Sequence, residues 1–468
     1  MKSIDYIFIL FLFFQFTHAG GQEKLTLERC RELALQQDQD LRIAGKQVDK
    51  AEAEKAALKT MRLPNLSASA TGLWMDKDFE MEMYLPTKTP NLTTGELEPN
   101  VVVDPSTGQP VTGADGNPVF NMYAWLPLNI SLSGAYMAGL SLEQPIYTGG
   151  KISAGNKMAD IGIGMAHENL KLQEMNTIAE ADKAYWTFVS VNEKVKLAER
   201  AVEMLDAIVG LVNDSYEVGM VNRNELLKAK VEYNKATLAL HKARNGLALS
   251  RMDLCRVAGL GLATQIEAVD TIINIGLMPE SGNEDITQRP EYRLMSKNID
   301  MQDENIKLTQ ADYLPVAGVS AGYSRIGGIE FTGEEFSNTS LNVVASLKIP
   351  VFHWGEGKKK TASAKIDKEI KELELEKNSQ LLQLEIHQAR LNLDAAYKRV
   401  EIAENALLQA GENLRISNDN FEVGMEKLTD LLTAQTHWQE AYSELIDSNA
   451  DYKIKETAYL KATGRLGN

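Results

Sequence analysis

The sequence is poor in aromatic residues, and long tracts of it contain no proline. Aromatic side chains make up 7% of the 468 residues. Proline is absent between Pro145 and Pro279 and again after Pro350, so nothing interrupts a helix in those two tracts. Nucleic-acid binding requires a basic surface, and a chain with a net charge of −16 does not supply one. These absences exclude a nucleic-acid-binding protein and favour long helices over a compact enzyme core.

Long apolar runs are also missing after the N-terminus. Residues 6–16 form a short apolar run, and Thr17-His18-Ala19 follows as a cleavage site, so residues 1–19 are predicted to be an export signal peptide. No later stretch reaches 18 continuous apolar residues, and we predict no transmembrane helix in the mature protein. The chain has two cysteines, Cys30 and Cys255. After export they could form a disulfide or remain two separate buried thiols.

The chain contains an internal repeat with a fixed offset of 205 residues. Residues 215–220, Ser-Tyr-Glu-Val-Gly-Met, reappear at 420–425 as Asn-Phe-Glu-Val-Gly-Met, and Pro145 and Pro350 keep the same offset. Such an offset identifies two copies of one structural unit. We assign residues 20–280 to the first repeat and 281–468 to the second.

Each repeat is predicted to contain a long helical hairpin, at 151–258 and 358–463. Gly219 and Gly424 stand where the helices must reverse, because glycine supplies the left-handed conformation just past a helix end. The outgoing helices should be about 95–100 Å long and the returning ones about 55 Å. Residues 25–60 and 286–312 are further helices. Apolar residues repeat every seven positions, as in a coiled-coil seam: Leu226, Tyr233, Leu240, Leu247 and Leu254, then Leu431, Trp438, Leu445, Tyr452 and Tyr459.

Four segments alternate apolar and polar residues and are predicted to be membrane strands. The alternation is strong near 127–145 and 339–351 and weaker near 64–75 and 315–326. A transmembrane strand needs about 9–11 such residues, apolar outward and polar inward. Residues 78–123 form an insertion between the first two strands. Its prolines and turn signals predict an extracellular loop.

Four strands cannot close a barrel alone, and an open sheet edge in lipid leaves backbone groups unpaired. We therefore expect three copies to associate, which gives twelve strands, an even number within the range of such barrels. The predicted fold is mainly α with a small β part. Long coiled-coil hairpins form an α-barrel, and four transmembrane strands per protomer complete a trimeric 12-stranded β-barrel.

The sequence resembles the TolC-like outer-membrane efflux family over nearly everything after the signal. The resemblance rests on the duplicated strand–helix–hairpin order and on the two Val-Gly-Met turns, which are followed by Glu225-Leu226-Leu227 and Asp430-Leu431-Leu432. It implies a passive homotrimeric conduit in the outer membrane of a Gram-negative-type bacterium, extending into the periplasm. Such a conduit serves a tripartite efflux or type I secretion system. The implied partners are a periplasmic adaptor (membrane fusion) protein, an inner-membrane transporter of the RND or ABC type, and outer-membrane lipid.

The same resemblance implies a set of site residues. Asp430 matches an aspartate ring that narrows the tunnel, and Thr433 stands where some relatives carry a second aspartate. Carboxylates facing one axis attract cations. Glu225 is a second candidate for the constriction, although a carboxylate near a helix N-terminus is also favoured by the helix dipole. The hairpin tips that would contact the adaptor are Val218, Gly219, Met220, Val423, Gly424 and Met425.

The sequence offers little support for catalysis. Its six histidines are scattered, and no cysteine pair has metal-ligand spacing. We expect no enzyme activity, no cofactor and no metal site. The basic stretch at 358–360, continued by Lys365 and Lys368, could be a solvated helix face, which we favour, or a membrane boundary. The alternative to a channel is a non-conducting periplasmic coiled-coil scaffold or adaptor, which would not need four two-faced strands.

Overall fold

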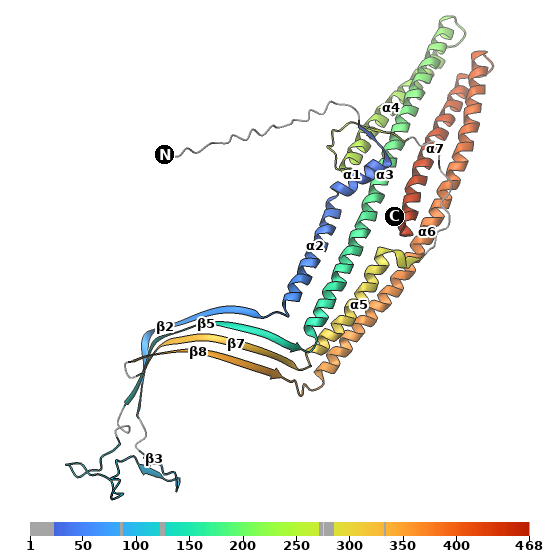
Figure 1. The fold of residues 1–468 in the computed structure, drawn as a ribbon. Helices are drawn as coiled ribbons and strands as arrows, with labels where there is room; N and C mark the ends of the chain where they lie inside the picture. Colours follow the sequence, from blue (N-terminus) through green and yellow to red (C-terminus); the bar gives the residue numbers. More distant parts are fainter. Residues whose placement is uncertain are drawn as a thin grey trace, which may run out of the picture. The chain divides into compact units, whose positions relative to one another are not determined.

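The computed structural model describes residues 23–84, 88–121, 127–270, 275, 285–331 and 334–467 (Figure 1). The chain divides into two compact units. Both units take segments from both sequence repeats, so the units cut across the repeat. The predicted signal peptide lies outside the described residues. The first unit comprises Met1–Ala53, Asp160–Asp303 and Ile366–Asn468, and the second comprises Glu54–Ala159 and Glu304–Lys365.

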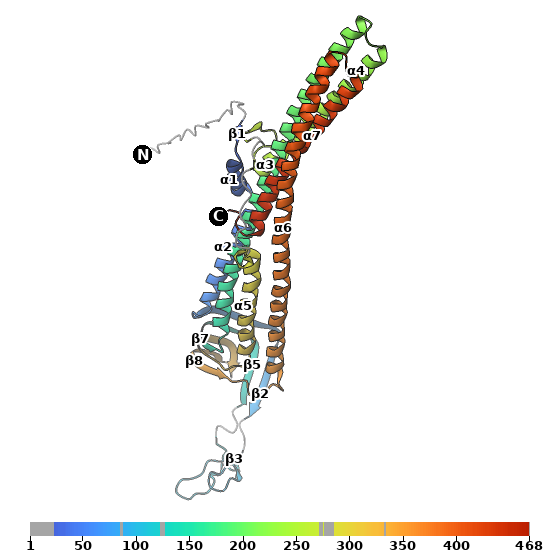
Figure 2. The same ribbon diagram turned by 90° about the vertical axis from the view of Figure 1, so that its right-hand side faces the viewer.

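Two hairpins of equal length form most of the first unit (Figures 1 and 2). Helices α3 (Lys151–Glu217) and α6 (Glu356–Glu422) each have 67 residues, and the returning helices α4 (Arg223–Val257) and α7 (Leu428–Ala462) each have 35. At 1.5 Å per residue these helices are about 100 Å and about 50 Å long. Their bounds lie within two residues of the predicted hairpins, and the two copies have the same helix lengths.

The predicted heptad seams lie in the interior of the hairpins. Leu254, Tyr452 and Tyr459 are fully buried, and so is the small residue Ala229. Near the turns, one apolar cluster takes residues from α3, α4 and α7, with Leu414 and Phe421 of α6 packed against it. Burying such side chains stabilises the fold by about 1.5–3 kcal/mol each. The two repeats therefore share a core at this end of the hairpins.

The N-terminal helical stretch is broken, which corrects the prediction of one helix over 25–60. Helix α1 (Leu27–Gln37) ends at Asp38, and α2 (Gln39–Thr60) follows at once. The Asp38 carboxylate accepts hydrogen bonds from the backbone N–H groups of Asp40 and Leu41, at 2.7 and 3.1 Å, and from the hydroxyl of Thr177, at 2.6 Å. A side chain that satisfies free backbone donors in this way starts a new helix. In the second repeat, α5 (Pro290–Ala311) follows the short 3-10 turn η2 (Ile286–Gln288).

Two features of the first unit concern the cysteines and a small sheet. Cys30 and Cys255 are free thiols, both fully buried in one apolar cluster. Of the two alternatives, a disulfide or two separate buried thiols, the structure shows the second.

Strand β1 (Glu23–Leu25) pairs in parallel with β6 (Ile266–Ala268) beside this cluster. This pairing could not be predicted, because strands of three residues are too short to show an alternating pattern.

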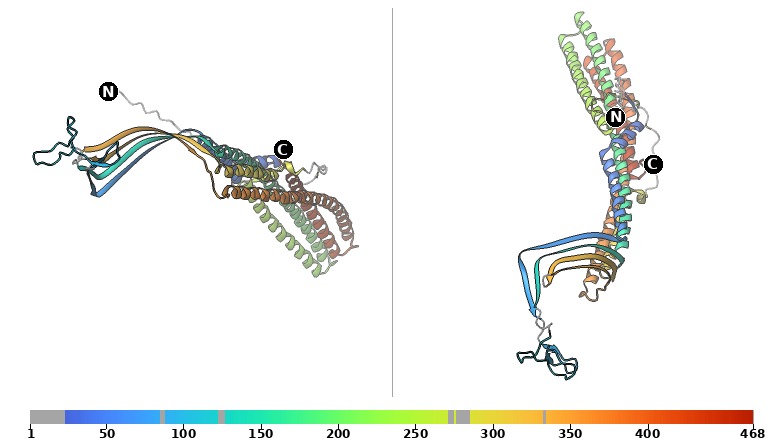
Figure 3. Two further views of the ribbon diagram at one scale, coloured as in Figure 1. Left: turned by 90° about the horizontal axis from the view of Figure 1, so that it is seen from below. Right: turned by 60° about the vertical axis from the view of Figure 1, so that its left-hand side comes forward.

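The second unit is built on a four-stranded sheet of neighbouring antiparallel strands, which bend together along their length (Figure 3). The order is β2-β5-β7-β8, so β2 and β8 are the edges within one chain. Among the described residues, no helix is long and apolar enough to cross a membrane. The strands are β2 (Asn65–Tyr84), β5 (Pro127–Thr148), β7 (Val316–Phe331) and β8 (Glu334–Lys348).

In the rows around Ser67 and Ser141, the strand register separates apolar from polar side chains across all four strands. Residues opposite one another share a face, and the next row lies on the other face. Ser67 and Ser141 are opposite, and their hydroxyls are 2.7 Å apart. This confirms the predicted alternation. The apolar face carries the rows Leu66, Leu142, Ala321, Val343 and Ala68, Leu140, Tyr323, Leu341, and the polar face carries Ser67, Ser141, Gly322, Asn342 and Ser69, Gly139, Ser324, Ser340.

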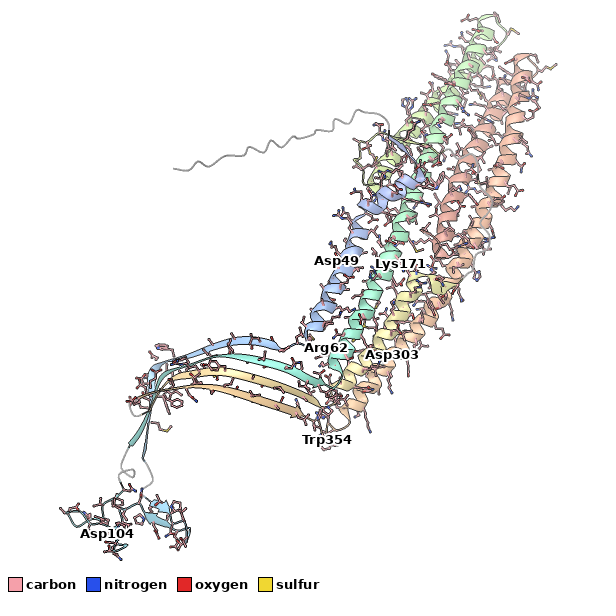
Figure 4. All side chains as sticks on the ribbon, viewed as in Figure 1. Asp49, Arg62, Asp104, Lys171, Asp303 and Trp354 are labelled. Atoms are coloured by element: carbon pink, nitrogen blue, oxygen red, sulfur yellow. The ribbon has the colours of Figure 1, made fainter. Side chains whose placement is uncertain are left out.

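The insertion between the first two strands carries β structure of its own. Strand β2 continues to Tyr84, past the predicted limit at 75, after a register shift between Trp74 and Phe79. The charged residues of this irregular stretch interrupt the alternation, which is why the sequence pattern ended early. Beyond it, β3 (Lys88–Pro90) pairs with β4 (Leu97–Pro99). Asp104, labelled in Figure 4, accepts hydrogen bonds from Ser106, which lower the pKa of the Asp104 carboxyl.

Candidate functional site

The two hairpin turns have the same backbone geometry. Gly219 and Gly424 have positive φ angles of 78° and 73°. In the first turn the N–H of Met220 donates to the carbonyl of Ser215 at 2.8 Å, and the N–H of Gly219 donates to the carbonyl of Tyr216 at 3.0 Å. The second turn repeats both bonds with Met425, Asn420, Gly424 and Phe421, at 2.8 and 3.0 Å. This is the Schellman arrangement, which satisfies the last carbonyls of a helix through a left-handed glycine.

The turns differ in how the returning helix begins. In the first, the side chain of Asn222 caps α4 by accepting a hydrogen bond from the N–H of Glu225 at 3.1 Å. In the second, Lys427 provides no side-chain cap. Instead, the carboxylate of Glu426 accepts a bond from the Ser417 hydroxyl of α6 at 2.8 Å. The second turn is therefore fastened to its outgoing helix rather than capped on its returning helix.

Both turns expose apolar side chains. Val218, Met220, Val423 and Met425 are between 69% and 82% exposed. Glycine alone would suffice for the turn, and side chains this exposed contribute little to packing within the described part of the chain. Methionine is flexible and polarizable, and is common on surfaces that bind partner proteins. The two tips therefore offer four adaptable apolar contacts.

The three candidate constriction residues lie in different surroundings. Asp430 and Thr433 are both exposed and are three residues apart on α7, so they share one face of that helix. Asp430 makes no ion pair within the described part of the chain. Glu225 is half-buried and its carboxylate is 3.0 Å from the Lys228 ammonium. The charge on Glu225 is thus partly compensated by Lys228, whereas Asp430 accepts a long hydrogen bond of 3.5 Å from the hydroxyl of Thr429.

A groove of about 580 Å³ lies between α4 and α7, close to the turns. Thr433 lines it, and Asp430 does not. Leu227 and Val231 line its α4 side, and His437 lies on its α7 side. The sequence analysis missed this groove. Leu227 and Val231 are not on the seven-residue line of α4 that forms the seam. This position was the one sign in the sequence that they would be exposed.

Comparison with known proteins decides the family. A profile described as "Outer membrane efflux protein" matches residues 30–260 and 283–465. The chain belongs to the outer membrane efflux protein family. Outer membrane efflux protein BepC of Brucella suis is 22% identical over 331 residues, which cover 70% of this chain and 72% of BepC. Outer membrane protein TolC of Vibrio cholerae is 20% identical over 303 residues, which cover 63% of this chain and 68% of TolC.

Solved structures agree with this assignment. The CmeC outer membrane channel of Campylobacter jejuni superposes with a TM-score of 0.71 at 17% identity, covering 94% of this chain and 85% of that chain. The family and the fold are those of channel proteins, which confirms the predicted fold class and the outer-membrane location. Membership of the outer membrane efflux protein family favours the main prediction over the scaffold alternative.

Proposed function

We propose that this efflux protein works as a trimeric passive conduit through the outer membrane, with a sheet from each of three copies closing one barrel. The observation that carries the proposal is the register of the four strands, which gives the sheet one apolar face and one polar face. Both edges, β2 and β8, have no further strand partner among the residues that the structure describes. An unpaired edge in lipid is not tolerated, so the edges must meet those of other copies.

Two uncovered apolar stripes on the helices support association. Exposed apolar residues on α6 and on α4 recur at spacings of three, four, seven, eight, eleven and fourteen, which place each set on one face of its helix. A stripe of this length left in water is unfavourable, and a second copy of the chain would cover it. The stripes are Ile366, Ile370, Leu373, Leu381, Leu384, Leu391, Ile402 and Ile416 on α6, and Leu227, Val231, Leu238, Leu249 and Met252 on α4.

The charge distribution supports a preference for cations. Asp430 is exposed and without an ion pair among the described residues, and three copies would place three such carboxylates near one axis. Acidic rings of this kind select cations.

Docking to the rest of an export system is the second part of the proposal. The apolar tips, Val218, Met220, Val423 and Met425, would contact a periplasmic adaptor protein that joins the channel to an inner-membrane transporter of the RND or ABC type. The channel itself would carry out no catalysis. A photoreactive residue in place of Val423 should cross-link to such an adaptor, and one in place of the buried Leu428 should not.

Conductance across a planar bilayer tests the conduit. The purified protein should give discrete channels that prefer cations, and Asp430→Asn should lower the ratio of cation to anion permeability. Asp214→Asn, which removes an exposed aspartate of α3 near the first hairpin turn, is the matched control and should leave the ratio nearly unchanged. Bilayers that stay silent with correctly assembled protein would overturn the proposal.

A further inference from the structure

The segment that joins β8 to α6 exposes large apolar side chains. Val351 is 89% exposed, Trp354 is 86% exposed, and Phe352 is 68% exposed. Ile349 and Val351 continue the alternation of the apolar face of β8, so this surface extends the face that the proposed barrel turns toward lipid. Tryptophan is enriched at the boundary between membrane and water.

The backbone of this segment holds its aromatic residues in place. Trp354 has a φ of 51°, the one positive value for a residue other than glycine in the described chain, and Gly355 follows with 78°. A bulky residue adopts this conformation only at a cost in free energy. The rings of Phe352 and Trp354 meet edge to face, with centroids 4.9 Å apart. Figure 4 labels Trp354 at this turn, before the first residues of α6.

A cluster of lysines follows immediately. Lys358, Lys359 and Lys360 occupy the beginning of α6, where the helix dipole disfavours cations. Lys360 pairs with Glu356 at 2.8 Å. Lys358, Lys359 and Lys365 are exposed and make no ion pair with any described residue. The chain as a whole carries a net charge of −16, and a helix N-terminus favours negative charge. A cluster of positive side chains at this position is therefore unusual on both counts.

Two of the lysines and two of the exposed apolar side chains line one cleft within the second unit. Its volume is about 870 Å³. Lys358 and Lys365, two helical turns apart on α6, line it together with the apolar residues Leu314, Val351 and Phe352. Cationic and apolar side chains in one cleft match the two parts of an anionic lipid: a phosphate headgroup and the start of an acyl chain.

We propose that residues 349–365 form a surface that binds anionic phospholipid at the boundary of the membrane. Lys358, Lys359 and Lys365 would contact the headgroup phosphate, and Phe352 and Trp354 would enter the lipid beside it. The inference rests on the proposed function, because it requires the sheet to lie in the bilayer. A lysine near an anionic membrane surface strengthens binding by roughly fivefold. Three lysines should therefore give a preference of at least about tenfold for anionic over neutral lipid, since their effects overlap.

Native mass spectrometry of the full chain in detergent measures this preference directly. Phosphatidylglycerol and phosphatidylcholine with identical acyl chains serve as probes. The wild type should retain phosphatidylglycerol at least about tenfold better, and Lys358→Gln/Lys359→Gln/Lys365→Gln should reduce the ratio to near one. The control Lys371→Gln/Lys377→Gln/Lys398→Gln removes the same charge from exposed or half-buried positions farther along α6 and should keep the preference.

Several outcomes would overturn the proposal. An unchanged preference in the first triple variant would remove the lysines from lipid binding. Loss of the oligomer in that variant, with the preference intact, would mean that another copy of the chain covers this surface. Displacement of phosphatidylglycerol by millimolar inorganic phosphate would identify a small-anion site instead. Conductance separates this test from the proposed function: silent bilayers with a retained lipid preference would overturn the conduit alone.

Discussion

Arg31 and Asp182 form a two-pronged ion pair, with Nε to Oδ1 and Nη2 to Oδ2 both at 2.6 Å. Asp182 is fully buried, and its Oδ2 also accepts a hydrogen bond from the hydroxyl of Thr457 at 2.6 Å. Arg31 belongs to α1, Asp182 to α3 and Thr457 to α7. One carboxylate therefore connects the N-terminal helix with a helix from each repeat, and its hydrogen bond raises the pKa of the Arg31 guanidinium.

Replacing this carboxylate should destabilise the protein strongly. Asp182→Ala leaves a partly buried guanidinium without its partner, and we expect a loss of about 3 kcal/mol. The estimate is at the low end for buried pairs because the Arg31 side chain remains 33% exposed. Asp447→Ala is the control, since Lys194 and Asp447 also join α3 to α7 but are more exposed, and it should cost under about 1 kcal/mol. Denaturant midpoints measure both, and equal shifts would contradict the role given to Asp182.

Substitutions at two leucines of α6 should distinguish an effect on the stability of the single chain from an effect on trimer formation. Leu393 is fully buried in the hairpin, whereas Leu391 is 68% exposed on the apolar stripe. Leu393→Ala should lower the free energy of unfolding by about 2–5 kcal/mol, because it leaves a cavity. Leu391→Asp should leave the single chain folded and reduce the trimer, because it places a charge in the proposed contact. Circular dichroism and light scattering measure the two effects, and a fully trimeric Leu391→Asp protein would remove this stripe from the interface.

The hairpins and the strand faces could be predicted because each follows from a local period. Leu254 and Tyr459 stand on seven-residue lines, and residues on such lines must share one face of a helix. Gly219 and Gly424 identify the turns, because a left-handed cap is a local requirement. Leu142 and Leu341 belong to alternating runs, so their common face follows from the pleat alone. None of these inferences required knowledge of distant contacts.

Other features depend on contacts that have no local signal. Asp38 breaks the first helix by capping the next one and accepting a bond from Thr177, which is far away in sequence. The charged residues near Asp76 concealed the second half of β2, because the period returns only after the register shift. The groove between α4 and α7 combines Val231 with His437, and only the packing of the two hairpins places these residues together.

The glycine of the second turn gives a prediction with a defined size. An added Cβ at Gly424 meets no atom within 4 Å, so Gly424→Ala should act only through its positive φ. We expect a cost of about 1 kcal/mol. Gly411→Ala, in the interior of α6, is the control. Its Cβ would lie 3.8 Å from Trp438, an ordinary contact, and it should stabilise the helix by up to about 1 kcal/mol. Hydrogen exchange of the turn amides measures the difference, and equal exchange in the two variants would argue against the Schellman geometry.

Cys30 should make stability fall at alkaline pH. Burial raises the pKa of its thiol from 9.0 to about 12, so the folded protein holds this proton more tightly than the unfolded chain does. The resulting stability is complete below about pH 9 and is lost as the pH rises toward 12, by up to about 1.4 kcal/mol per unit. Burial also raises the pKa of Tyr185, which adds a slope of the same sign.

Comparison with Cys30→Ala isolates the contribution of the thiol, because Tyr185 is present in both proteins. Between pH 9 and pH 11 the denaturant midpoint of the wild type should fall more steeply than that of the variant, and below pH 8 the two curves should run parallel. The buried thiol should also resist maleimide at pH 8 until the chain unfolds, since burial denies the reagent access and keeps the thiolate scarce. Parallel curves up to pH 11 would show that the thiolate forms without unfolding, and that Cys30 is less enclosed than its packing against Tyr185 and Leu254 requires.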